Sequence, residues 1–283
     1  MRLYKKAAAV LLAAVMAVSM LTACGGGGSG SGGGSGSGSG GSGSGSGGSG
    51  SGSGTGTGSN MEYSTDFDEN TTGGTASKIL EEAQPISYSG SKAKANFSGS
   101  YTYEFRGNFG DYGDQTGNFV ADMMVTTNGN RTYSGGTGTI SVEGLNVTSN
   151  IVTLTDQQAN KEWIIDLDKG TYKVQKYIED NAAFDKDLLQ RVRFYKGKYK
   201  VDSQMYDAEA FSVVTTSEGI PMTVTFIYCY EGNTPKYLIG RGYALDGQYD
   251  DEVIRIGIKN FSRTARTEFL DFDNILSKYK PES

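Results

Sequence analysis

Apolar and polar residues alternate over most of the chain beyond residue 100. In the segments 101–109 and 119–125, apolar residues recur at nearly every second position. A period of two is typical of antiparallel strands that bury one face. The apolar face of these two segments is predicted to carry Tyr101, Tyr103, Phe105, Phe119 and Met123.

Similar patterns predict further strands along the rest of the chain. They are expected at 139–147, 151–154, 162–167, 171–174, 206–214, 222–230, 237–245 and 253–261. The dipeptide Asn128-Gly129 is a hairpin signal between two such runs. The glycine-rich stretch 134–138 has no lysine and no following helix, both of which a phosphate-binding loop needs, and is predicted to be a turn.

Helical patterns are fewer. Residues 76–84 contain good helix formers and stop before Pro85, which predicts a short N-terminal helix. An apolar stripe predicts a helical insert over 178–194, and residues 269–279 are expected to end the chain in a helical turn. The sequence therefore predicts an α+β fold, in which a large antiparallel sheet is packed against the short N-terminal helix and the helical insert.

The N-terminus has the pattern of an export signal. Residues 1–23 begin with basic side chains and continue with an apolar run that is too short to span a bilayer. The following Leu-Thr-Ala-Cys at 21–24 resembles the lipobox of bacterial lipoproteins. That resemblance implies cleavage before Cys24 and acylation of its thiol. We expect a lipid anchor at Cys24 that holds the protein at the extracytoplasmic face of a cell membrane.

A tether separates this anchor from the folded part. Residues 25–58 are only Gly, Ser and Thr, so they cannot build a core and behave as a flexible coil. The organisation predicted is a signal peptide at 1–23, a lipidated Cys24 with a Gly/Ser tether over 24–60, and one folded domain at 61–283. A single tethered domain is expected to be a monomer by default.

Composition excludes several chemistries. The chain has no histidine and two cysteines, which rules out Ser-His-Asp catalysis, His-ligated zinc and a disulfide scaffold. Residues 1–23 hold three cations and no carboxylate, so their removal takes the net charge from −6 to −9. An acidic domain is repelled by phosphate backbones, so no nucleic-acid partner is expected. No metal, cofactor or catalytic residue is predicted, and Cys229 is expected to be an inert buried thiol.

The aromatic residues carry the ligand hypothesis. Large flat groups on the inner face of one curved sheet can line an apolar trough. The candidate lining residues are Tyr101, Tyr103, Phe105, Phe119, Met123 and Trp163. Each ring taken alone is better explained by ordinary core packing, and only the set points to a ligand.

Two stretches resemble a known family. Residues 162–172, and 206–211 followed by 224–238, have the form of a tyrosine-rich strand, a turn and a second strand. They are similar to hairpins of the LolA/LolB/LppX-type lipoprotein family, with a likeness that extends over 76–261. The resemblance implies a curved half-barrel sheet with a hydrophobic cavity that holds a lipid or acyl chain, and no catalytic residue.

Three functions remain open at this point. The first is a membrane-anchored, non-enzymatic lipoprotein that binds a hydrophobic or amphipathic ligand in the half-barrel, as carrier or sensor. The second is a surface recognition or adhesion module for glycan, peptidoglycan or a protein partner. The third is an envelope hydrolase built on carboxylates, whose separation in space the sequence does not give.

Overall fold

One sheet organises the molecule. The structure, a computed structural model, describes residues 75–109, 117–142, 145–177, 189, 191–217, 220–244 and 250–282. Within them, a 13-stranded sheet has the order β1-β8-β9-β10-β11-β12-β2-β3-β4-β5-β6-β7-β13. The described pairings are antiparallel except that β13 runs parallel to β7. The predicted signal peptide, Cys24 and the tether lie outside the described residues.

The strands are β1 Glu81–Ile86, β2 Tyr101–Phe109, β3 Gly117–Thr127, β4 Arg131–Val142, β5 Leu145–Asp156, β6 Lys161–Asp166, β7 Thr171–Lys176, β8 Phe194–Val201, β9 Gln204–Ser217, β10 Ile220–Glu231, β11 Thr234–Ala244, β12 Asp250–Ser262 and β13 Lys280–Pro281. The α-helices are α2 Ala76–Ile79, α3 Lys92–Asn96 and α5 Phe272–Leu276, with 3-10 turns at Tyr88–Gly90 and Thr267–Phe269.

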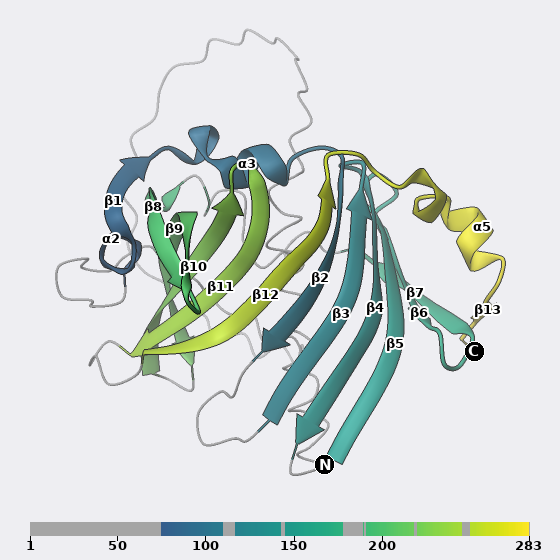
Figure 1. The fold of residues 1–283 in the computed structure, drawn as a ribbon. Coiled ribbons are helices and arrows are strands. Elements are labelled where there is room, and N and C mark those ends of the chain that lie inside the picture. Colours follow the sequence, from purple (N-terminus) through teal and green to yellow (C-terminus); the bar gives the residue numbers. More distant parts are fainter. Residues whose placement is uncertain are drawn as a thin grey trace, which may run out of the picture.

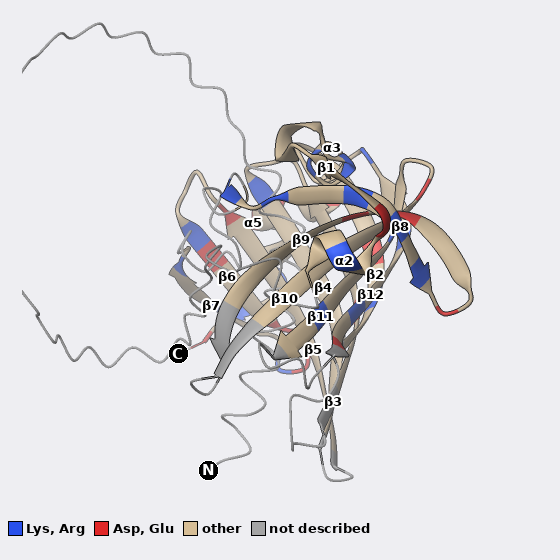
Figure 2. Cartoon of the chain, turned by 90° about the vertical axis from the view of Figure 1, so that its left-hand side faces the viewer, with Lys and Arg blue, Asp and Glu red and all other residues tan. Residues whose placement is uncertain are grey.

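The sheet is open and strongly curved (Figures 1 and 2). The ring of Phe97, which follows α3, lies 5.9 Å from the ring of Tyr103 in β2 and 6.3 Å from that of Tyr228 in β10. Three strand spacings separate β2 from β10, which is about 14 Å in a flat sheet. One ring reaches both strands because it sits on the concave side, so α3 covers the concave face.

The other two helices pack on the opposite face. Ala76 and Leu80, at the two ends of α2, lie in a core cluster with Ala208 and Cys229, whose side chains point away from the concave face. Near the other end of the sheet, Phe272 of α5 packs in a separate cluster with strands β5 and β6. Strands β9 and β10 are therefore buried on both faces, while the largest core cluster lies on the concave side.

The α+β prediction is wrong, because strands dominate and the three described helices are only 4, 5 and 5 residues long. The structure has a single large β-sheet with short helices on its faces. Of the predicted helical insert, residues 178–188 and 190 lie outside the described residues. Its last residue, Phe194, is paired with Ile86 of β1 as the first residue of β8.

Two predicted elements, the helix at 76–84 and the strand at 139–147, have different bounds in the structure. The helix predicted at 76–84 ends at Ile79, and the next residues join β1, where Glu82 takes a positive φ of 56° at an irregularity in the pairing with β8. The strand predicted over 139–147 contains a chain reversal, since Val142 pairs with Leu145. In the first case strand pairing with β8 has overridden local helix propensity.

The glycine-rich stretch 134–138 is the middle of β4, so the predicted turn is wrong. A Cβ on Gly136 would lie 2.1 Å from the carbonyl oxygen of Asp122 in β3, and one on Gly138 would lie 2.9 Å from the ring of Phe119. Glycine is required at these positions because the neighbouring strand β3 approaches too closely for any side chain.

Candidate functional site

The predicted ligand-binding residues divide between the two faces. Tyr101, Tyr103, Phe105 and Phe119 belong to the concave core cluster, and Met123 packs against it. The two tyrosines are fully buried and the two phenylalanines are 3% exposed. Trp163 lies instead in the cluster on the opposite face, with its ring 5.8 Å from that of Phe272. Five of the six residues are thus brought together, and one is not.

The chain itself fills the concave aromatic face. The ring of Phe97 meets those of Tyr101 and Tyr103 edge-on, at 5.7 and 5.9 Å, and that of Phe261 at 5.8 Å. Phe97 is fully buried. Edge-to-face contacts at these distances are typical of packed cores. The described rings therefore form a closed core under α3.

One polar atom in this core is unsatisfied. The hydroxyl of Tyr103 is buried and has no hydrogen-bond partner in the structure. Burial raises the pKa of this phenol well above its ordinary value, with a smaller contribution from Tyr228. The hydroxyl therefore stays protonated, and it marks a polar point in an otherwise aromatic region.

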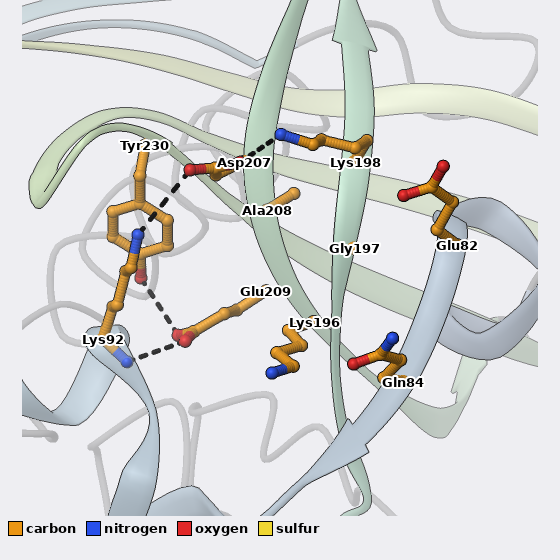
Figure 3. Close-up of a pocket in the computed structure, with 10 residues that line it drawn as sticks. All are labelled: Glu82, Gln84, Lys92, Lys196, Gly197, Lys198, Asp207, Ala208, Glu209 and Tyr230. Atoms are coloured by element: carbon orange, nitrogen blue, oxygen red, sulfur yellow. Dashed lines mark hydrogen bonds and ion pairs between the residues drawn. The ribbon is translucent and has the colours of Figure 1, made fainter.

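A pocket of about 290 Å³ opens beside the N-terminal end of α3 (Figure 3). It is formed where β1, β8, β9 and β10 meet that helix. Its lining residues are Glu82, Gln84, Lys92, Lys196, Gly197, Lys198, Asp207, Ala208, Glu209 and Tyr230. Three lysines and three carboxylates are among them, so the pocket is charged with both signs.

Glu209 anchors α3 in this pocket. Its side chain is 5% exposed, and its two oxygens accept hydrogen bonds from the backbone N–H of Lys92 at 2.8 Å and of Ala93 at 2.9 Å. The Tyr230 hydroxyl donates to the same carboxylate at 3.4 Å (Figure 3). A carboxylate that receives the first N–H groups of a helix satisfies donors that have no partner within the helix. Glu209 is therefore structural, with both oxygens already in use.

Asp207 carries a second group of contacts. Its carboxylate lies 2.5 Å from Nζ of Lys198 and 3.9 Å from Nζ of Lys92. The hydrogen bond from Lys198 lowers the pKa of Asp207, and the same bond raises the pKa of Lys198. Lys92 also donates to the carbonyl oxygen of Gly232 at 2.6 Å. Both lysines therefore already have ion-pair or hydrogen-bond partners within the protein.

Lys196 is the lysine of the pocket for which the described residues provide no ion-pair partner. In the sheet register it lies between Gln84 of β1 and Glu209 of β9. Its side chain is exposed, and in the part of the chain that the structure describes it has no ion pair. With Glu82, which is also exposed, it leaves one charge of each sign available to a ligand.

Two kinds of reactive group, a metal cluster and an activated thiol, can be checked in the described residues. Among them, no group of three His, Cys, Asp or Glu side chains is arranged to bind an ion. Burial, with a smaller effect of Glu252, raises the pKa of the Cys229 thiol to about 12, which Arg255 only partly offsets. A thiol with that pKa is a poor nucleophile at neutral pH.

Sequence reasoning missed the pocket because it predicted no strand over Phe194–Val201, where the structure has β8. Lys196 and Lys198 sit two apart, as do Asp207 and Glu209, so each pair lies on one face of its strand. Pairing between β8 and β9 puts the two pairs opposite each other. The alternating charges at 196 and 198 and at 207 and 209 could have indicated two strands that each carry charges on one face. The register that brings the two strands together could not be predicted from the sequence.

Within the described ranges, no helix is both long and apolar enough to cross a membrane. A scan against protein-family models finds no match to this chain, and a search of curated proteins finds no similar sequence.

Proposed function

We propose that the protein is a membrane-tethered, non-catalytic recognition module of the cell envelope that binds a polar ligand in the charged pocket. The lipobox-like sequence at Cys24 supplies the anchor in this proposal, and residues 25–58 supply the tether. The ligand class is a peptidoglycan or glycan fragment that carries hydroxyl groups together with charges.

The observation that carries the proposal is the contrast between the two concave regions. The aromatic region is occupied by Phe97, whereas the pocket beside it is open and lined by six charged side chains. An acyl chain in that pocket would strip water from those charges without replacing their hydrogen bonds, which is unfavourable. A polar ligand can form hydrogen bonds with these charged groups in place of the lost water. The lining therefore favours a polar ligand over an acyl chain.

The charge pattern narrows the ligand further. Asp207 is shared by two lysines and Glu209 is saturated by backbone amides, so neither is available. Lys196 and Glu82 are available, and they match a ligand with a carboxylate and an ammonium group. Peptide-bearing fragments of peptidoglycan carry both groups.

Calorimetry on the mature chain with Cys24→Ser tests the proposal. Soluble peptidoglycan fragments should bind, and Lys196→Ala should weaken binding by about tenfold or more, because one charge-assisted hydrogen bond is lost. The matched control is Lys259→Ala, an exposed lysine of β12 that does not line the pocket, which should leave the affinity unchanged. Binding of a fatty acid in place of the fragments, or equal affinity for both variants, would overturn the proposal.

The anchor has its own test. Cell fractionation of the full-length protein should find it with membranes, and Cys24→Ser should release it, because the acyl chains can no longer be attached. Continued membrane attachment of the variant would contradict a lipid anchor at Cys24.

A further inference from the structure

The two edges of the sheet are protected to different degrees. At the β1 edge, Pro85 lies within the strand and the pairing is irregular beside Glu82, which has a positive φ. Proline and irregular pairing are common ways to prevent further strands from joining a sheet. At the other edge, β13 covers only Thr171 and Tyr172 of β7. The remaining residues, Lys173 to Lys176, have no described strand on that side.

Hydrogen bonds identify which backbone groups of β7 face this open edge. The carbonyl oxygen of Tyr172 accepts from the N–H of Glu282 at 2.7 Å on the β13 side. The N–H of Tyr177 donates to Asn160 at 3.2 Å, on the β6 side. Because N–H and C=O groups alternate in direction along a strand, those of Val174 and Lys176 point outward. They form a short row of backbone groups on which another strand can pair.

The side chains around this row are cationic. Lys161 of β6 lies directly opposite Lys176 of β7, and Lys173 lies on the other face of the same strand. Like charges opposite each other destabilise a strand pair. In the described part of the chain none of these three lysines has an ion pair, in contrast to Lys169, which pairs with Asp166 at 2.7 Å.

Two carboxylates of the neighbouring strands β5 and β6 already have hydrogen-bond partners. Asp156, which lies opposite Lys161 on β5, accepts from Arg131 at 2.9 Å and from the N–H of Ala159 at 2.8 Å. Glu162 accepts from the side-chain amide of Gln175. A concentration of unpaired lysines in an otherwise acidic protein is electrostatically complementary to an acidic partner.

An apolar contact is also available at this edge. Val174 is 53% exposed, and it lies opposite Trp163 in the register of β6 and β7. Trp163 is the single tryptophan of the chain. A side chain placed beside Val174 would therefore lie close to a natural fluorescent reporter.

We propose that Lys173–Lys176, the part of β7 that no described strand covers, is a strand-addition site for an extended, acidic polypeptide segment of a partner protein. Backbone pairing with Val174 and Lys176 supplies general affinity, and carboxylates of the segment pair with Lys161, Lys173 and Lys176. The site lies on different strands from the charged pocket and does not depend on it.

Fluorescence titration of the mature chain with Cys24→Ser tests this site. The probe is a capped synthetic peptide of alternating Glu and Val, added at low ionic strength while Trp163 emission is followed. A saturable change in emission is expected, and Lys161→Glu/Lys176→Glu should weaken binding by about tenfold or more. The matched control Lys259→Glu, which alters charge on β12, should bind as the parent does.

A second variant separates backbone pairing from charge. Val174→Pro removes an outward N–H that β6 does not use, and an edge strand tolerates proline, so the fold should persist while peptide affinity falls. The proposal is overturned by no saturable change, by equal binding of a Lys–Val peptide, by equal affinity in the double lysine variant, or by emission that changes with protein concentration alone. The last result would indicate self-association, and binding only to vesicles with anionic lipid would likewise contradict a peptide site. Lys196→Ala, which tests the pocket, should leave this binding intact.

Discussion

The backbone N–H of Lys92 lies 2.8 Å from Oε1 of Glu209 and joins the start of α3 to the middle of strand β9. Through this contact the residue that lines the charged pocket also holds the helix that precedes Phe97. The pocket and the closed aromatic core are therefore parts of one arrangement, in which α3 forms the boundary between them.

Replacing Glu209 by Gln should destabilise the protein. The amide offers one oxygen in place of two, so one of the N–H groups of Lys92 and Ala93 loses its acceptor in a buried position. An unsatisfied buried donor costs about 1–3 kcal/mol in the free energy of unfolding. Chemical denaturation measures the change, and the exposed Glu231→Gln in the same sheet should alter stability by less than about 0.5 kcal/mol. Equal stability of the two variants would show that Glu209 does not anchor the helix.

Replacing Phe97 by Ala should have a larger effect. The ring is fully buried among four aromatic rings, and its removal leaves a cavity in the concave core. Such truncations cost about 3–5 kcal/mol. Met205→Ala, at a side chain that is 43% exposed, is the control and should change the melting temperature little. A melting temperature for Phe97→Ala equal to that of the control would mean that the aromatic face is not closed by this ring.

The titration of Asp207 should depend on Lys198. The hydrogen bond from Lys198 lowers the pKa of Asp207 in the folded protein, so this ion pair contributes stability above the ordinary aspartate pKa and loses it as the pH falls through the folded pKa. Lys198→Ala should raise the pKa of Asp207 towards the ordinary value. NMR titration of the side-chain carboxyl carbon measures this directly, and an unchanged titration midpoint would rule out the pair in solution.

Cys229 should be chemically inert in the folded protein. With a pKa of about 12, roughly one molecule in ten thousand carries the thiolate at pH 8, and the side chain is fully buried. In a chain of residues 24–283 with Cys24→Ser, a thiol reagent should therefore react only after denaturant is added. Rapid labelling of the native protein would place Cys229 at an accessible position.

The strands of this protein could be predicted where one face is buried and the other is polar. The segment 101–109 coincides with β2, and Asn128-Gly129 lies at the turn between β3 and β4, where Gly129 has a φ of 92°. The period of two also placed Tyr101, Tyr103 and Phe105 on one face, which the core cluster confirms. These features depend on neighbouring residues alone, which is why the sequence contains them.

Features that depend on distant pairing could not be predicted in the same way. The chain after Ile79 leaves the helix because Glu81 to Ile86 pair with β8, more than a hundred residues later. Trp163 alternates like the other aromatic residues, but nothing local indicates that it lies on the face covered by α5. The charged pocket likewise needed the register between β8 and β9, which brings Lys196 opposite Glu209.

A native mass spectrum of residues 24–283 with Cys24→Ser, recorded with and without soluble peptidoglycan fragments, tests the central claim most directly. The proposed closed aromatic face and polar pocket predict the bare polypeptide mass without added ligand. They predict a one-to-one complex with a fragment, which Lys196→Ala reduces. A co-purified lipid-sized adduct that is lost on denaturation, with no fragment complex, would contradict the account and favour an apolar ligand in the concave face.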